Sequence, residues 1–335
     1  MSKKAKEPGN AFAYDDAFRT MEGECDDILI PFVNYVFGEH YTKEAVIRRM
    51  RNEHFIARAG ETEEKRVTDS HFEISERGIS KRYHIECESK PYDNSLLIRF
   101  LEYDTSTAMD DVRWEGDKLV VRFPNSGLLL LRNSKKTPQE AQIVMETPGG
   151  AVSYPIKILK VSDYSVEEIF EKHLYLLIPF YIFNYEKNLS TIAGDEIQTD
   201  VLAGVYNDIV ERLNKEQEVG SLSAFSFSVI INMTKKVLDK LAHKHGTVRR
   251  KVGEQMGGRV LDLPIIRAYH EAKDAGRIEG INEGKIEGRA ELLTEMIRNK
   301  VRKGKPLDVI AEELEMKSSE LQDIYDAVIK ETVAI

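Results

Sequence analysis

Residues 81–90, KRYHIECESK, are the segment from which the fold of this chain is predicted. Tyr83, Ile85 and Cys87 alternate with polar residues, and alternation with a period of two predicts a β-strand. Successive side chains of a strand point to opposite faces, so the second face carries three charged residues in a row: Glu86, Glu88 and Lys90. A polar strand face normally contacts water. The alternative is that this row lines a cleft and holds a divalent cation.

A second strand is predicted just before this one, at residues 65–74. Residues 75–80 are predicted to form a hairpin turn with Gly78 at the bend. The two strands are then antiparallel neighbours, which brings Asp69 towards Glu86. Two carboxylates that converge from adjacent strands suit a hard cation such as Mg²⁺ (or Mn²⁺). A metal of this kind polarises a phosphodiester and lowers the pKa of a bound water.

Composition limits the possible classes of function. The 335 residues are 41% hydrophobic and 31% charged, which suffices for a sizeable core in two or more units. The formal net charge of −9 argues against binding of nucleic acid through the overall charge of the protein. Any DNA contact is therefore expected to be local or assisted by metal. Two cysteines make no disulfide framework, which fits a reducing cytoplasm.

No membrane contact and no signal peptide are predicted. The longest apolar run, residues 174–183, is interrupted by Pro179 and is about half the roughly 20 residues that a membrane span needs. We expect it to form a buried, kinked helix. The basic residues 1–10 lack a following apolar region and are expected to be a disordered tail.

Apolar residues at three- and four-residue steps predict a helical segment at residues 14–37. Pro31 should kink this segment or split it into two helices, and Gly38 should end it. Acidic residues crowd its middle, and such residues usually form a solvated face. Glu24 is the one that we expect, in the alternative interpretation, to lean over the strand pair and add an oxygen ligand.

A second helix is predicted at Ser95–Met109. Arg99 and Glu102 lie three residues apart on its surface and suggest an exposed ion pair; the functional alternative for Arg99 is a phosphate contact at the cleft edge. Several strands follow up to residue 158, and the unbroken apolar run at residues 128–131 predicts a central strand. The succession of helix, strands, helix and strands indicates an α/β or α+β layer structure for residues 11–160.

The remainder of the chain is predicted to be mainly helical. Residues 161–262 form a helical extension whose Ser165-to-Glu168 segment resembles a capping box. Residues 263–304 are predicted to be one long helix or linker, with a glycine at every fourth position from Gly276 to Gly288 in a repeat that ends at Glu291. This repeat has two interpretations, a flexible charged linker or a bare stripe through which two copies of the helix approach closely in a homodimer.

Residues 305–335 are predicted to form a small helical hairpin that resembles a helix-turn-helix. Its second helix is acidic, whereas helices that read DNA present positive groups to phosphates. Docking of a protein is therefore the favoured interpretation. A basic cluster just upstream is the candidate for phosphate contacts: Arg298, Lys300, Arg302, Lys303 and Lys305.

Three segments together resemble the Rpn family of recombination-promoting nucleases and putative transposases, which belongs to the PD-(D/E)XK superfamily. They are residues 68–70, 83–89 and 98–104. Residues 15–19, residues 178–181 and the glycine–glutamate repeat are similar to this family too. The resemblance covers most of the chain and is most specific between residues 66 and 104.

This resemblance implies a restriction-endonuclease-like core, with a mixed sheet flanked by helices, and Mg²⁺-dependent cleavage of DNA. By position, Asp69 matches the superfamily's aspartate and Glu86 its (D/E), and both would ligate metal. Glu88 stands where the superfamily has lysine and this family often has glutamine. In one interpretation, Glu88 is a third metal ligand or positions the attacking water, and Lys90 supplies the ammonium group. In the other, Glu88 indicates a nuclease whose activity is weakened or lost.

Two functions therefore follow from the sequence. The first is a metal-dependent DNA endonuclease with its catalytic residues on the strand pair (Asp69, Glu86, Glu88 and Lys90) and its phosphate contacts at Arg99, Arg298, Arg302 and Lys303. The second is a non-catalytic interaction protein that keeps the nuclease-like fold and self-associates through its helical C-terminal half. The acidic charge balance, Glu88 and the glycine stripe support the second function.

Overall fold

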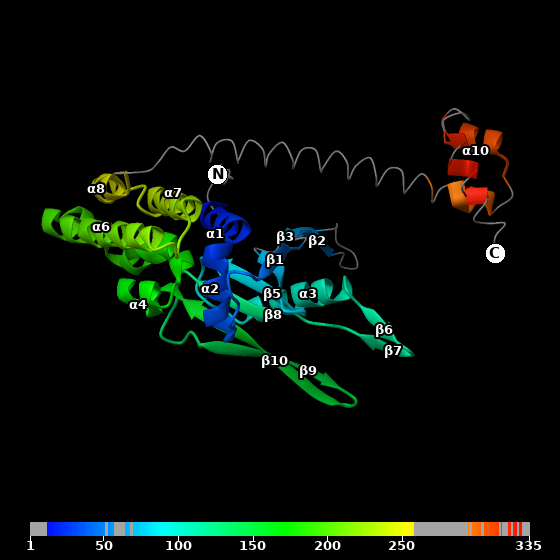
Figure 1. Ribbon diagram of the computed structural model, residues 1–335, viewed down its shortest axis with the longest axis horizontal. Coiled ribbons are helices and arrows are strands. Elements are labelled where there is room, and N and C mark those ends of the chain that lie inside the picture. Colours follow the sequence, from blue (N-terminus) through cyan, green and yellow to red (C-terminus); the bar gives the residue numbers. More distant parts are fainter. Residues whose placement is uncertain are drawn as a thin grey trace, which may run out of the picture. The chain divides into compact units, whose positions relative to one another are not determined.

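The structure, a computed structural model, describes residues 12–50, 53–56, 64–67, 70–257, 294, 297–302, 305–314, 316, 321–322, 324–326 and 328–329 (Figure 1). The chain divides into two compact units, Met1–Leu261 and Asp262–Ile335, and each unit is described by itself. Within the part of the chain that the structure describes, no helix has both the length and the apolar character needed to cross a membrane.

A mixed sheet of six strands forms the centre of the first unit, in agreement with the predicted α/β or α+β layer structure. The strand order is β1-β4-β5-β8-β10-β9; β5, β8 and β10 are parallel, and the other neighbours are antiparallel. The strands span Val46–Arg49 (β1), Ser70–Glu76 (β4), Ile79–Glu88 (β5), Asn125–Leu130 (β8), Glu140–Thr147 (β9) and Gly150–Lys160 (β10). Two small separate sheets are formed by β2 (Glu53–Ile56) with β3 (Glu64–Val67) and by β6 (Arg113–Glu115) with β7 (Lys118–Val120).

The predicted hairpin of β4 and β5 is confirmed. Arg77 and Gly78 have φ angles of 51° and 79°, and two consecutive positive φ values are typical of the turns that match the twist of a hairpin. The predicted strand at residues 65–74 is in fact two strands with different partners, because β3 pairs with β2 whereas β4 pairs with β5 and β1. Asp69 lies outside the described residues, directly before the first residue of β4, Ser70, which pairs with Ile85.

The N-terminal helical segment is split at a different place from the predicted one. Helix α1 (Phe12–Glu24) and helix α2 (Asp26–Phe37) meet at Cys25, whereas Pro31 lies inside α2. Burial of residues on both sides of Pro31, Leu29 and Phe32 among them, holds α2 in place although the proline removes one hydrogen bond. Gly38 ends α2 as predicted: its φ is 67°, and its N–H donates to the carbonyl of Asn34.

Helices cover both faces of the sheet. Tyr83, Ile85 and Cys87 of β5 pack in a large core with α1, α2 and the helical segments after residue 165. The opposite face carries a second core in which Phe100 of α3 (Ser95–Met109, the predicted bounds) contacts residues of β8 and β10. The central position predicted for the apolar strand is confirmed, because β8 lies between β5 and β10 and only its first residue is exposed.

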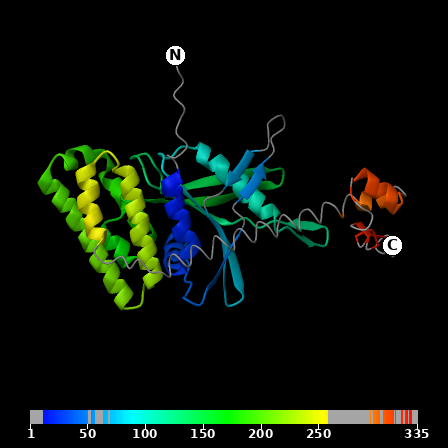
Figure 2. The same ribbon diagram turned by 90° about the horizontal axis from the view of Figure 1, so that it is seen from above.

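A layer of helices closes one end of the first unit (Figures 1 and 2). The predicted capping box is present at the start of α4, where Ser165 and Glu168 exchange hydrogen bonds. The elements of this layer are η1 (Val161–Asp163), α4 (Val166–Glu171), η2 (Tyr175–Asn188), α5 (Leu189–Ala193), α6 (Glu196–Glu218), α7 (Ala224–Leu241) and α8 (Gly246–Gly257). Up to Gly257, these bounds match the helical character that is predicted for residues 161–262, and residues 258–262 lie outside the described residues.

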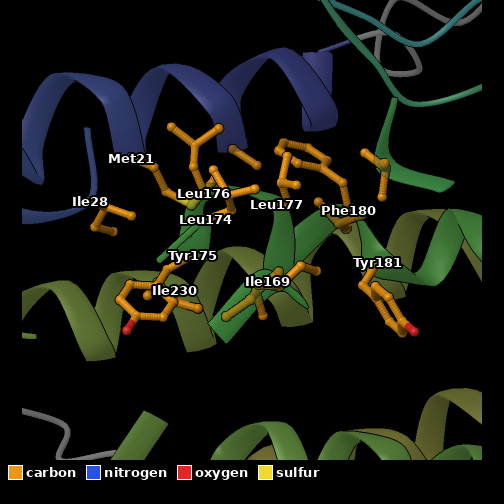
Figure 3. Packing of buried hydrophobic residues seen from close by; sticks show 14 of the residues in the cluster. Met21, Ile28, Ile169, Leu174, Tyr175, Leu176, Leu177, Phe180, Tyr181 and Ile230 are labelled. Carbon is orange, nitrogen blue, oxygen red and sulfur yellow. The ribbon is translucent and has the colours of Figure 1, made fainter. Parts of the chain in front are cut away.

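The apolar run at residues 174–183 is buried, as predicted, but it forms the 3₁₀-helical segment η2 rather than a kinked α-helix. Figure 3 shows Leu174, Leu176 and Leu177 lying towards the helix that carries Met21, while Tyr175 lies on the other side. A 3₁₀ helix has three residues per turn, so its side chains point in three directions. This geometry suits a segment that is surrounded by protein on all sides.

The second unit has a small core of its own. Helix α10 (Leu307–Glu313) contributes two buried residues to a cluster with residues before and after it: Ile297, Ile310, Ala311, Leu321 and Val328. Helix α10 lies within the residues that are predicted to form a helical hairpin, 305–335, and the hairpin itself stays a prediction. The glycine repeat at residues 276–291 and its predicted dimer contact lie outside the described residues.

Candidate active site

The polar face of β5 is buried, in contrast to an ordinary solvated strand face. His84 and Glu86 are only 2% and 3% exposed. The rings of Phe100 and Tyr103 on α3 lie 5.0 and 5.9 Å from the imidazole of His84, measured between ring centroids. Burying charged groups is costly unless each has a partner, so the contacts of these two residues define the site.

His84 lies between two carboxylates. Its Nδ1 atom is 2.7 Å from Oδ1 of Asp104 on α3, and its Nε2 atom is 3.0 Å from Oε1 of Glu86. Burial lowers the pKa of His84, but the hydrogen bonds to Asp104 and Glu86 outweigh this effect and raise the pKa to about 9. The imidazole is therefore protonated at neutral pH and donates a hydrogen bond from each ring nitrogen.

Asp104 is fully buried and accepts further hydrogen bonds at its second oxygen. Ser126 of β8 donates to Oδ2 over 2.8 Å, and the hydroxyl of Tyr154 on β10 donates to the same atom over 3.2 Å. A continuous network thus runs from β10 and β8 through Asp104 and His84 to Glu86. A satisfied buried network of this kind fixes the orientation of its members, so one oxygen of Glu86 has a set direction.

Arg99 of α3 joins the two glutamates of β5. Its Nη2 atom is 3.1 Å from Oε2 of Glu86 and 3.4 Å from Oε2 of Glu88. The arginine side chain is 31% exposed, so the contact lies at the border between the buried network and solvent. The phosphate contact predicted for Arg99 stays a prediction, and the structure adds that this guanidinium faces the carboxylates.

Helix α1 brings Asp15 near the same group. Burial raises the pKa of Asp15, the Arg19 guanidinium lowers it, and the negative charges of Glu88 and Glu86 raise it further, with a raised pKa as the result. Asp15 was not among the candidate site residues from sequence. Its only signal there is the similarity of residues 15–19 to the Rpn family.

Lys90 does not continue the polar row of the strand. β5 ends at Glu88, and Lys90 follows in a bend with an exposed side chain, so the prediction that it shares the strand face is wrong. Pro91 comes next, and a proline restricts the residue before it and cannot donate to a sheet. The backbone N–H of Lys90 donates to Oε1 of Glu88 over 2.9 Å.

The remaining candidates are spread over the chain. Glu24 is the last residue of α1, and Arg298 and Arg302 belong to the second unit. Asp69 and Lys303 lie outside the described residues. Among the residues that are described, no three or more His, Cys, Asp or Glu side chains gather in a metal-binding group.

The carboxylates of β5 nevertheless fit a divalent cation. Oε2 of Glu86 and Oε2 of Glu88 both approach one nitrogen of Arg99, so they already converge on a single positive charge. Carboxylate oxygens are the ligands that Mg²⁺ prefers, and Mg²⁺ commonly takes one or two of them together with waters and substrate phosphates. In comparisons with known proteins, no family model, no curated protein and no solved structure matched this chain.

Proposed function

We propose that this protein is a metal-dependent DNA endonuclease with a restriction-endonuclease-like core, of the Rpn type. One observation carries the proposal: Glu86 and Glu88 converge on one cationic point at the border of a buried polar network. The mixed sheet and the β4–β5 hairpin support it, because residue 69 directly precedes the strand that pairs with β5.

In this proposal, Glu86, Glu88 and Asp69 hold Mg²⁺ or Mn²⁺. Such a metal, when bound, would polarise the phosphodiester and lower the pKa of a water molecule bound to it. The hydrogen bond between His84 and Oε1 orients Glu86, whose Oε2 atom would be the metal ligand. Arg99 then turns from the carboxylates to the phosphate, whose oxygens suit the planar guanidinium fork.

The proposal also accounts for the glutamate at the position where the superfamily has lysine. One cation stays beside Glu86 in this arrangement, the imidazolium of His84. It offsets negative charge that a lysine would otherwise offset. Glu88 is free in this arrangement to act as a ligand rather than as a source of positive charge.

A second candidate function, a non-catalytic interaction protein, has one specific observation in its favour. Both oxygens of Glu86 are engaged by side chains of the protein itself, Oε1 by His84 and Oε2 by Arg99. A site that is neutralised by its own side chains is stable without a cation. In that case the network on β5 stabilises the fold, and the predicted self-association through residues 276–291 supplies the function.

Cleavage of supercoiled plasmid separates the two functions. The wild type is compared with Asp69→Ala and Glu86→Gln in Mg²⁺, in Mn²⁺ and in EDTA, and Glu115→Gln, on the exposed β6 strand, is the matched control. We expect metal-dependent nicking by the wild type and by the control, and loss of at least about 100-fold in both site variants. A folded wild type that leaves the plasmid intact under all conditions favours the interaction protein.

A further inference from the structure

A cavity of about 1020 Å³ lies beside α2. Three other stretches of the chain complete its wall: the loop that leads into β1, the turn between α4 and η2, and the loop between α6 and α7. All four belong to residues 12–50 and 70–257, which the structure describes without a gap. The cavity is large enough for a small organic ligand, since ligand pockets commonly measure about 300–1,000 Å³.

Apolar and aromatic side chains form part of this wall. Ile30 of α2 and Leu222 of the α6–α7 loop are buried and line the cavity. Tyr35, also on α2, is 41% exposed, and its hydroxyl accepts a hydrogen bond from Tyr164 over 3.2 Å. A tyrosine ring that is held in place and still exposed offers a flat surface to a planar ligand.

The two carboxylates of the wall already have donors within the protein. Asp27 accepts hydrogen bonds from the backbone N–H of Ser223, over 2.8 Å, and from the hydroxyl of Ser226. Oδ1 of Asp26 lies 2.6 Å from Nη2 of Arg49. A cationic ligand would have to displace these donors, so the acidic residues do not make this a cation site.

Two lysines of the wall keep donors that no carboxylate uses at hydrogen-bond distance. Nζ of Lys43 donates to the carbonyl oxygen of Gly220 over 3.0 Å and has two further N–H groups. Nζ of Lys172 lies 3.7 Å from Glu168 and 4.0 Å from Glu171, and both distances are longer than a hydrogen bond. The remaining donors of the charged groups therefore belong to ammonium groups, which favours an anionic group on the ligand.

His173 adds an acceptor to the wall. Its φ is 52°, a conformation that few residues other than glycine adopt, and its Nδ1 atom lies 2.7 Å from the hydroxyl of Tyr175. Burial and a hydrogen bond with Glu216 raise the pKa of Tyr175, so this hydroxyl keeps its proton. Because a carboxylate only accepts, the hydroxyl donates to Glu216 and accepts from Nδ1–H of His173. In the neutral imidazole, Nε2 then keeps a lone pair for a hydroxyl group of a ligand.

We propose that this cavity binds a ribonucleoside monophosphate. The base lies against the ring of Tyr35, and a ribose hydroxyl donates to Nε2 of His173. The phosphate accepts hydrogen bonds from Lys43 and Lys172; its charge of about −1.5 to −2 at neutral pH matches two ammonium groups better than a single carboxylate does. None of these residues belongs to the candidate site on β5, so binding does not depend on the proposed nuclease function.

Isothermal titration calorimetry of the full chain in EDTA measures this binding without any catalytic step. AMP, GMP, CMP and UMP are titrated in turn, and we expect saturable binding of at least one of them to a single site. Lys172→Gln should raise the Kd of that nucleotide at least about 10-fold, because it removes a charged hydrogen-bond donor. The Kd of the matching nucleoside, which lacks the phosphate, should be unchanged in the same variant.

His173→Asn separates the ribose contact from the phosphate contact. Asparagine tolerates a positive φ, so the turn after α4 is kept. This variant should raise the Kd of the nucleotide and the Kd of the nucleoside by the same factor, several-fold, because both ligands carry the ribose.

The matched control is Lys136→Gln, which removes the same charge from an exposed side chain in the loop between β8 and β9. This variant should keep the wild-type Kd. Lys172→Gln is expected to fold, because the ion pairs that it removes are longer than hydrogen bonds, and an unchanged thermal midpoint verifies this point. If its midpoint falls, Lys43→Gln tests the same phosphate contact from another stretch of the wall.

A wild type that binds none of the four nucleotides overturns the proposal, as do equal Kd values for the wild type, Lys172→Gln and Lys43→Gln. A nucleoside that binds as tightly as its nucleotide overturns the phosphate contact. Inorganic phosphate that binds as tightly as the nucleotide overturns the contacts to the base and the ribose.

Discussion

The buried imidazole of His84 makes a specific prediction about stability and pH. Its pKa is raised to about 9 in the folded protein by Asp104 and Glu86, against a burial effect of opposite sign, whereas an unfolded histidine has a pKa near 6.5. A group whose folded pKa is raised stabilises the fold fully below the unfolded pKa and loses this contribution as the pH rises through the folded pKa. We therefore expect a loss of stability between about pH 6.5 and pH 9.

The magnitude follows from the difference between the two pKa values. Each unit corresponds to about 1.4 kcal/mol, so deprotonation of His84 removes about 3 kcal/mol of unfolding free energy once the pH exceeds 9. Urea unfolding followed by circular dichroism at pH 6, 7.5 and 9 measures this loss for the wild type. His84→Gln keeps a side chain that forms hydrogen bonds but does not titrate, and its unfolding free energy should fall much less over the same range.

Subtracting the two pH profiles removes the contributions of all other titrating groups. If the wild type and His84→Gln lose the same unfolding free energy between pH 6.5 and 9, the imidazole is not held as a cation between the two carboxylates. His84 would then have no charge with which to orient Glu86.

Three further predictions concern Asp104, Gly38 and Arg99. Asp104→Asn removes the charge that faces the His84 imidazolium at 2.7 Å and should lower the unfolding free energy by roughly 3 kcal/mol in urea titrations; a loss below 1 kcal/mol would contradict a charged pair. Gly38→Ala should lower the unfolding free energy by about 1 kcal/mol, because Gly38 has a φ of 67° that alanine rarely adopts. No atom lies within 4 Å of an added Cβ, so backbone strain is the only expected cost. A thermal midpoint equal to that of the wild type would refute this strain. Arg99→Gln should tighten Mn²⁺ binding several-fold in calorimetric titrations, because it removes the cation that competes for the β5 carboxylates; weaker binding would show that Arg99 supports the site.

Local signals in the sequence predicted the parts of the fold that local chemistry determines. The bounds of α3 follow from its apolar spacing, the turn at Gly78 and the end of α2 at Gly38 follow from residues that tolerate positive φ, and the capping box at Ser165 follows from two side chains three residues apart. The buried position of β8 follows from its unbroken apolar run.

Features that depend on contacts between residues far apart in the sequence could not be predicted from such local signals. The break at Cys25 rather than at Pro31 depends on how α2 packs, which outweighs the intrinsic effect of proline. Lys90 leaves the strand because β5 ends at Glu88, although the alternation of polar residues continues in the sequence. A period of two identifies a strand but not its last residue.

The candidate site was predicted in part. The pattern on β5 identified Glu86 and Glu88 as neighbours on one face, and the structure brings both to Arg99. The roles of Asp104, Ser126 and Tyr154 were not predicted, because these residues come from three other elements and meet only after the sheet and α3 have packed. No spacing of residues in the sequence predicts these contacts.

The central claim is that the carboxylates of β5 bind a divalent cation, and direct titration with Mn²⁺ tests it most closely. Electron paramagnetic resonance of free Mn²⁺ measures binding to the full chain without any need for turnover. We predict a saturable site in the wild type and in Glu115→Gln, and binding at least about 10-fold weaker in Glu86→Gln, which loses one ligand charge. Equal Mn²⁺ binding by the wild type and Glu86→Gln, or no binding by either, would contradict the account.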